Sequence, residues 1–299
     1  MTEQLPRDAI VVGVDSSADS DLALDWALNL ARHTHQPVHA VHVQPFPPTT
    51  VTEDERGGQR WAESGRGIVT AAVLRGREMP GVPMSGQSLE DVDSDPGEAL
   101  VELCRGASML VVGARGHGAV VGLLAGSVSQ YAARHAPCPV VAVRPAHDHD
   151  SRRVVVGVDY TPESHESIGL AFQLASDLRV DLTAIHTWHA ASLHGAGTRV
   201  LPMPADVGTD VHDQHQALAD NLAMWQQKFP TVPLTVEAVP GHAAAVLVDA
   251  SEHAGILVVG GGQRQSVTGA LLGSVSEKVL HHARCPVVIA RGPSTPGGT

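Results

Sequence analysis

A glycine-rich segment that ends in a Gly-Ser pair, "LVVGARGHGAVVGLLAGSVS", occupies residues 110–129 of the sequence. Glycines let a backbone approach a ligand closely, and the start of a helix offers N–H groups without partners together with a partial positive charge. Because the segment combines both features, it predicts a cradle for an anion such as phosphate. Such a cradle is built from backbone rather than lysine, and the only lysines in the chain are Lys228 and Lys278.

The common catalytic and nucleotide fingerprints are missing from the chain. A Walker A loop needs GxxxxGK[ST], which does not occur, and the dinucleotide fingerprint GxGxxG should follow the first strand, where this chain has "GVDSSADS". "GARGHG" follows a later strand and therefore does not qualify. A serine-hydrolase elbow, GxSxG, is also missing. The sequence therefore predicts no catalytic residue.

Polar side chains near the glycines offer the remaining contacts. Ser127 and Ser129 can donate hydroxyl protons to phosphate oxygens, whereas Arg115 and His117 either supply charge or are simply solvated. Asp15 follows the first apolar run, where a carboxylate can accept from a ribose hydroxyl or contact a metal-bound phosphate. The alternative for Asp15 is a turn or helix-cap role.

Charge and cysteine content exclude several classes of protein. Acidic residues outnumber basic ones, 32 to 20, and the formal charge of −12 disfavours a nucleic-acid or anionic-membrane surface. No signal-like start and no apolar run near the ~18 residues of a membrane span is present, so we expect a cytoplasmic protein. Cys104, Cys138 and Cys285 are too scattered for a disulfide framework or zinc cluster and are predicted to be buried thiols.

The chain is a tandem duplication. The segment "IVVGVDSSADSDLALDWALNLA" reappears as "VVVGVDYTPESHESIGLAFQLA", so that Asp15 matches Asp159 at an offset of 144 residues. Likewise "GSVSQYAARHAPCPVVAVR" returns as "GSVSEKVLHHARCPVVIAR". The 299 residues suit two domains, which we place at 1–146 and 151–293. Between them, the His-Asp alternation of "PAHDHDSRR" predicts a solvated linker without a metal.

Each half alternates strands with helices. Ser16 or Ser17 is predicted to cap the first helix, and Pro96 and Pro240 to open a later helix in each half. His42 and His186 end the second strands, where they either touch a ligand or hold a turn. Strands are predicted at 10–14, 38–43, 109–113 and 139–143, with a weak third strand interrupted by Gly86, and at 154–158, 182–187, 232–238, 256–260 and 286–290.

Five strands joined by helical crossovers predict a doubly wound parallel α/β sheet in each half. With strand order 3-2-1-4-5, strands one and four flank the topological switch point, where ligands bind beyond the carboxyl ends of the strands. The glycine segment leaves strand four, so the sequence places the anion cradle at the switch point. A helix begins there near Gly126, or near Gly273 in the second half.

These features together resemble the universal stress protein family in its tandem, two-domain form. The ATP-binding pattern of that family is Gly, two residues, Gly, nine residues, then Gly followed by Ser or Thr. Gly113, Gly116, Gly126 and Ser127 satisfy the pattern. The resemblance covers nearly the whole chain and implies, for each half, the fold of the adenine nucleotide alpha hydrolase-like proteins.

Site residues follow from the resemblance. It implies that Asp15 meets the ribose or adenine side of a nucleotide and that the backbone of Val43 faces the adenine. Around the phosphates it places Gly113, Arg115, Gly116, Gly126, Ser127, Val128 and Ser129. The matching residues of the second half are Asp159, Thr187, Gly260, Gly273, Ser274, Val275 and Ser276.

The leading hypothesis is a regulatory protein of a stress response that binds ATP, with or without Mg²⁺, as a ligand rather than as a substrate. Expected partners are an adenine nucleotide, a regulatory protein and a second copy of the chain in a homodimer. A slow ATPase or nucleotide-transfer enzyme is the first alternative, although "GVDSSAD" lacks the paired glycines of SGGxDS. A dimeric scaffold that binds no nucleotide is the second.

Two further expectations concern the relation between the halves. The fifth strands, "CPVVAVR" and "CPVVIAR", are apolar and expected at a sheet edge, and an open edge attracts a partner. The resemblance implies that the two domains pair through these strands about a pseudo-twofold axis. The second half carries Gln263 where the pattern has its second glycine. If that position requires a positive φ, the first half binds ATP more tightly; the alternative is that Gly262 takes over.

Overall fold

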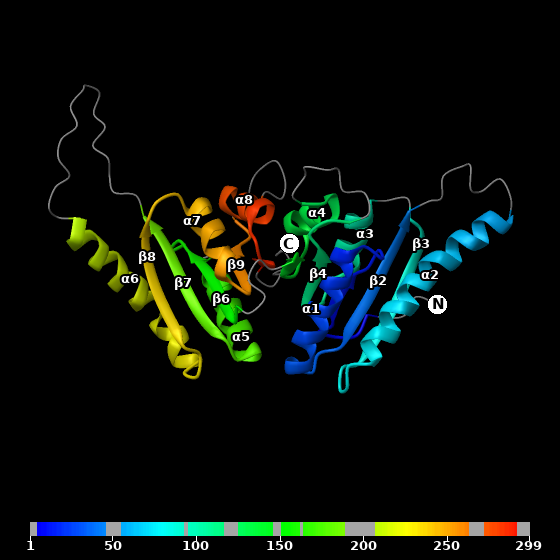
Figure 1. Cartoon of the computed structure of the whole chain (residues 1–299), viewed down its shortest axis with the longest axis horizontal. Helices are drawn as coiled ribbons and strands as arrows, with labels where there is room; N and C mark the ends of the chain where they lie inside the picture. The colour runs from blue at the N-terminus through cyan, green and yellow to red at the C-terminus, as the bar shows by residue number, and fades with distance from the viewer. Residues whose placement is uncertain are drawn as a thin grey trace, which may run out of the picture.

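The computed structural model of the chain describes residues 5–45, 55–92, 95–116, 125–145, 151–161, 164–188, 207–262 and 272–291. Strands and helices alternate along both halves (Figure 1). The first half contains β1 (Ile10–Gly13), α1 (Ala18–Thr34), β2 (Val38–Pro45), α2 (Glu55–Arg77), β3 (Met84–Val92), α3 (Pro96–Leu103), β4 (Met109–Gly113), α4 (Ser127–His135) and β5 (Val140–Val143). The second contains β6 (Arg153–Val158), α5 (Ser164–Leu178), β7 (Asp181–Trp188), α6 (Val207–Lys228), β8 (Leu234–Pro240), α7 (Ala243–Ala250), the 3₁₀ turn η1 (Ser251–His253), β9 (Ile256–Gly260), α8 (Ser274–His282) and β10 (Val287–Ala290).

The ten strands of the described residues form one continuous sheet in the order β3-β2-β1-β4-β5-β10-β9-β6-β7-β8. Pairing is parallel within each half, which confirms the doubly wound order 3-2-1-4-5. The halves meet where β5 pairs antiparallel with β10, with Val141 opposite Val288. The predicted pairing of the fifth strands is therefore confirmed, and it turns two sheets into one.

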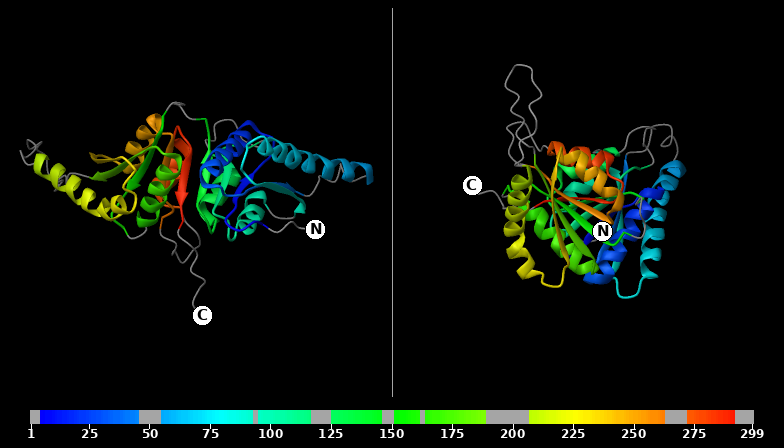
Figure 2. Two further views of the ribbon diagram at one scale, coloured as in Figure 1. Left: turned by 90° about the horizontal axis from the view of Figure 1, so that it is seen from below. Right: turned by 60° about the vertical axis from the view of Figure 1, so that its left-hand side comes forward.

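Helices cover both faces of the sheet, and each face buries one hydrophobic cluster that runs through both halves (Figure 2). Alternate strand residues divide between the clusters, so that Ile10 belongs to one and Val11 to the other. The first cluster includes Leu24 of α1 and Phe172 of α5, and the second includes Leu100 of α3. No helix in the described part of the chain combines the length and apolarity needed to cross a membrane.

One arginine from each half binds across the junction of β5 with β10, which we call the seam. Arg144, just after β5, donates to the carbonyl oxygen of Ala283 at 2.8 Å, beyond the end of α8. The equivalent Arg291 donates to the carbonyl oxygen of Ala133 in α4 and is buried. Because carbonyls at a helix C-terminus carry partial negative charge, the two guanidinium groups stabilise the docking of the halves reciprocally.

Two predictions about individual elements are wrong. Strand β3 runs through Gly86, because a glycine is what lets helix α2 pack there: a Cβ at this position would lie 2.7 Å from Val69 and 2.8 Å from the Ala40 carbonyl oxygen. Pro240 ends β8 instead of opening a helix, and α7 begins three residues later behind the N-cap residue His242. Pro96 does open α3, as predicted.

Candidate functional site

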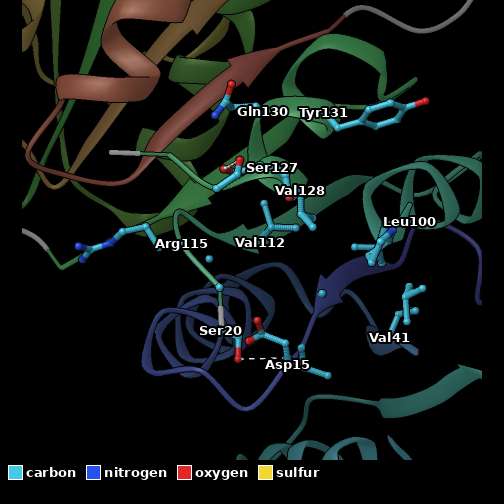
Figure 3. A pocket seen from close by; sticks show the side chains of 18 of the residues that line it. Asp15, Ser20, Val41, Leu100, Val112, Arg115, Ser127, Val128, Gln130 and Tyr131 are labelled. Carbon is cyan, nitrogen blue, oxygen red and sulfur yellow. Dashed lines mark hydrogen bonds between the residues drawn. The ribbon is translucent and has the colours of Figure 1, made fainter. Parts of the chain in front are cut away.

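A cavity of about 780 Å³ opens at the carboxyl ends of β1 and β4, which is the predicted switch point. Its volume lies in the range typical of small-molecule sites. Figure 3 shows Asp15, Ser127 and Val128 gathered around it from β1 and the start of α4. Of the predicted site residues of the first half, the cavity is lined by Asp15, Val43, Gly113, Arg115, Gly116, Gly126, Ser127, Val128 and Ser129.

Asp15 forms the turn that follows β1. Its Oδ1 atom accepts hydrogen bonds from the backbone N–H of Ser17 at 2.9 Å and from the Ser17 hydroxyl at 2.5 Å. Ser17 is in turn the N-cap of α1, because its side chain accepts from the N–H of Ser20. The turn role predicted for Asp15 is confirmed and occupies Oδ1, whereas the cap of α1 is Ser17. A Cβ on Gly116 would lie 2.6 Å from Asp15 Oδ2, so this second oxygen faces the glycine loop.

Helix α4 presents an uncapped amino terminus to the cavity. Its N-cap residue is Gly126, which has no side chain to cap the helix. The Gly126 N–H donates to the carbonyl oxygen of Ala114 at 2.7 Å, which holds the helix start against the end of β4. The first helical bond runs from Gln130 to Gly126, so the N–H groups of Ser127, Val128 and Ser129 precede it. This arrangement provides donors and a partial positive charge for an anion.

The Ser129 hydroxyl does not have the role predicted for it. Ser129 is 1% exposed, and its Oγ donates to backbone, with the carbonyl oxygens of Gly126 at 3.0 Å and Ala114 at 3.2 Å. The equivalent Ser276 donates to the carbonyl oxygen of Gly260. These hydroxyls fasten the helix start to the preceding strand, and Ser129 can contact a ligand only through its N–H.

Arg115 is also used differently. Both its backbone N–H and its Nε contact Asp19 Oδ2 in the first turn of α1, at 3.1 and 3.3 Å. Its guanidinium consequently extends away from Asp15 in Figure 3. Asp19 also explains Gly113, because a Cβ there would lie 2.8 Å from the Asp19 carbonyl carbon. The fold itself therefore requires glycine at position 113. No local sequence pattern indicates the contact with Asp19.

The opposite wall of the cavity is apolar. Val41, Val43 and Leu100 line it, and Figure 3 places Val41 and Leu100 on the side away from Arg115. Such a wall suits a planar, largely apolar group such as a purine. His42 Nδ1 donates to the carbonyl oxygen of Val14 at 2.7 Å, as His186 does to Val158 at 2.8 Å, which confirms the turn-holding interpretation of these histidines. Leu100 was not predicted as a site residue, because a leucine in a helix is typical of the core.

The second half repeats this construction around a cavity of about 360 Å³. Asp159 Oδ1 accepts from the N–H and hydroxyl of Thr161 at 3.1 and 2.7 Å, and the N-cap residue of α8 is the uncapped Gly273. The predicted residues that line the cavity are Asp159, Thr187, Gly260, Gly273, Ser274, Val275 and Ser276.

The positive φ considered for the second glycine of the pattern is not found in the first half. The described glycines with positive φ are Gly81, Gly106, Gly241 and Gly262, which leaves out Gly116. Gly262 has φ of 77°, and a Cβ on it would lie 2.7 Å from the N atom of Gly273. The special backbone conformation in the second half thus falls on Gly262. Gln263 itself, like His117 and the linker residues 146–150, lies outside the described residues.

Fold and cavities define a class of protein: tandem doubly wound α/β proteins with a cavity at the switch point of each half. A family model described as the universal stress protein family matches residues 6–144 and again 151–291. The chain is 36% identical to universal stress protein Rv2005c of Mycobacterium tuberculosis, over 97% of this chain and 99% of that protein. It is 34% identical to universal stress protein Rv2623 of the same species, over 94% and 96%.

Solved structures share the fold at lower identity. A universal stress protein from Archaeoglobus fulgidus superposes with a TM-score of 0.68 at 16% identity, over 96% of this chain and 97% of that one. The functionally unknown protein PA1789 from Pseudomonas aeruginosa gives 0.63 at 17% identity, over 96% and 93%. The chain therefore belongs to the universal stress protein family, in its tandem form.

Proposed function

We propose that the chain is a regulatory protein that binds an adenine nucleotide, with ATP as the leading candidate, in the cavity of its first half. The observation that carries the proposal is the uncapped start of α4, which faces an apolar wall across a cavity of about 780 Å³. Phosphate oxygens fit the N–H groups of residues 127–129, and a purine fits the wall formed by Val41, Val43 and Leu100.

The presence of glycine at position 126 is a second reason to propose a ligand at the start of α4. Its φ of −76° is open to any residue, and a Cβ on it would be no closer than 3.4 Å to the nearest protein atom, the Ala114 carbonyl oxygen. The fold therefore does not require glycine at position 126. Close approach of a bound phosphate does require it, because a side chain there would occupy the space next to the helix start.

Mg²⁺ would find a partial site in the cavity. Among the residues that the structure describes, no group of three His, Cys, Asp or Glu side chains is arranged to hold a metal. Mg²⁺ commonly uses one or two carboxylates together with phosphate oxygens. Asp15, which lines the cavity, would be the carboxylate ligand from this chain.

We further propose that the nucleotide is held rather than turned over. What supports this proposal is that the Walker A, SGGxDS and GxSxG patterns are missing from the sequence. His42 Nδ1 donates to the Val14 carbonyl oxygen and Arg115 Nε contacts Asp19. We expect ATP hydrolysis far below the ~10 s⁻¹ typical of dedicated enzymes. A Mg²⁺-dependent rate near that value, lost in Asp15→Ala, would instead identify an enzyme.

Calorimetric titration of ATP into the full chain and into Gly126→Val tests the binding site. Gly67→Val is the matched control, because a Cβ on Gly67 in α2 meets no atom within 4 Å. We expect Gly126→Val to lose binding in the first half and Gly67→Val to retain it. Native mass spectrometry of the purified chain adds a readout of co-purified nucleotide. Failure of the wild-type chain to bind ATP or any adenine nucleotide would refute the proposal.

A further inference from the structure

A second kind of cavity, of about 470 Å³, lies at the opposite end of the strands, between the two halves. The lower ends of α1 and α5, which approach each other in Figure 1, form part of its walls, together with the starts of β6 and β9. We call it the basic crevice, and it is lined by Trp26, Asn29, Leu30, Arg32, His33, Ser151, Arg152, Arg153, Val154, Leu178, Arg179, Val180, Gly255 and Ile256.

Positive charge is concentrated in the basic crevice. Four arginines and a histidine line it, contributed by both halves: Arg32 and His33 from α1, and Arg152, Arg153 and Arg179 from the second half. The whole chain has a formal charge of −12, so this concentration runs against the average of the molecule. No acidic side chain is among the lining residues.

The guanidinium groups of the crevice keep N–H donors that the described fold does not engage. Among the described residues, no ion pair involves any of these four arginines. Arg32 donates to Asn29 Oδ1 at 3.2 Å and Arg153 to the carbonyl oxygen of His253 at 3.1 Å, and each bond uses one nitrogen of a guanidinium that has five N–H donors. Asp177, which precedes the lining residue Leu178, accepts a hydrogen bond from Gln173, and burial raises the pKa of its carboxyl.

The duplication provides an internal comparison. Helices α1 and α5 end in the same way, with left-handed residues at the matching positions His35 and Arg179. The segments that match the crevice in the repeat nevertheless lack this charge. For example, α5 has no basic residue in its last turn, where α1 has Arg32 and His33. At the offset of 144 residues, the counterparts of Arg32, His33, Arg152, Arg153 and Arg179 are Ser176, Asp177, Asp8, Ala9 and His35. The positive charge is therefore a property of this crevice and not of the fold.

We propose that the basic crevice binds a small polyanion that carries two or more linked phosphate groups. Planar guanidinium groups form paired, charge-assisted hydrogen bonds with phosphate oxygens, and several of them converge here from two halves of the chain. The volume suits a ligand of that size. Since the walls come from both α1 and α5, a bound polyanion bridges the halves at the end of the sheet remote from the nucleotide cavities.

Titration of the full chain with inorganic tripolyphosphate, followed by calorimetry and by tryptophan fluorescence, tests this site. Arg32→Ser and Arg153→Ala introduce the residue that the other half carries at the same place, so folding is expected to survive. Arg105→Ala, at an exposed position after α3, is the control with the same change in charge. We expect each crevice variant to weaken binding by roughly tenfold or more. The control should bind as the wild type does.

Two further measurements keep the test independent of the nucleotide cavity. Gly126→Val should bind tripolyphosphate as tightly as the wild type, and a fluorescence response present in the wild type should be lost in Trp26→Phe. Affinity should fall as salt rises from low ionic strength to 0.15 M, as charge-driven binding does. The proposal is overturned if millimolar tripolyphosphate does not bind. It is also overturned if Gly126→Val abolishes binding while Arg32→Ser and Arg153→Ala leave it unchanged.

Discussion

Asp15 has two separable roles, and substitution distinguishes them. Asp15→Ala removes the acceptor of the Ser17 N–H and hydroxyl, two hydrogen bonds of 2.9 and 2.5 Å, and leaves the turn before α1 without its anchor. A hydrogen bond to a charged group contributes about 1.5–3 kcal/mol, and the turn is only partly buried. We therefore expect a loss near the lower end, about 1.5–2 kcal/mol of unfolding free energy.

Asp15→Asn tests the other role. An asparagine keeps an oxygen in the position of Oδ1 and supports the same kind of turn, so we expect it to restore most of the lost stability. It removes the negative charge, and any contact that depends on that charge stays lost. Ligand binding that fails in Asp15→Asn while stability is retained would assign Oδ2 to the ligand.

Urea unfolding followed by circular dichroism, without nucleotide, measures the stability. Asp159→Ala is the internal replicate, because Asp159 anchors the same turn through Thr161. The exposed Glu63→Ala in α2 is the control and should stay within about 0.5 kcal/mol of the wild type. Wild-type stability in both aspartate-to-alanine variants would refute the argument that the turn holds the start of each half.

Three other outcomes follow from the structure. Gly86→Val should lower the free energy of unfolding by about 1–3 kcal/mol, seen as a lower urea midpoint, since its side chain would collide with α2 and the β2 backbone; a wild-type midpoint would show that α2 can move aside. Burial raises the pKa of the Cys285 thiol to about 12, so in a variant with serine at positions 104 and 138 an aromatic disulfide reagent at pH 8 should modify Cys285 only after unfolding. Arg291→Ala should destabilise the chain more than Arg134→Ala, because the first breaks a buried bond at the seam and the second a partly exposed ion pair worth about 0–1 kcal/mol; equal losses in denaturation would contradict this.

The backbone of the site could be predicted from the sequence because its determinants are local. The run from Met109 to Gly113 is a buried strand by composition, and the start of α4 at Ser127 follows from the Gly-Ser pair. Because the same pattern of strands and helices occurs twice in the chain, the strand order and the pairing of the fifth strands could also be predicted.

Side-chain roles were harder to predict because they depend on partners far along the chain. Arg115 is held by Asp19, which is 96 residues away, and no local pattern links them. The Ser129 hydroxyl turns to Ala114 because the end of β4 passes beside α4. From the sequence, Gly86 was expected to interrupt its strand, but it lies within β3 at the point where helix α2 packs on the sheet. Each error arose where a residue type was judged from its neighbours in sequence rather than in space.

The antiparallel junction of β5 with β10 joins surfaces that belong to a single chain, so its formation does not depend on protein concentration. Each half meets the other at an effective concentration that is roughly millimolar for short tethers. A dimer of identical subunits must place the same residue on both sides of its axis, whereas a tethered pair is free of that constraint. Covalent linkage thus lets one side of the pseudo-twofold axis carry Arg152 and Arg153 where the other carries Asp8 and Ala9. Duplication within one chain in this way allows two matching surfaces to differ in charge.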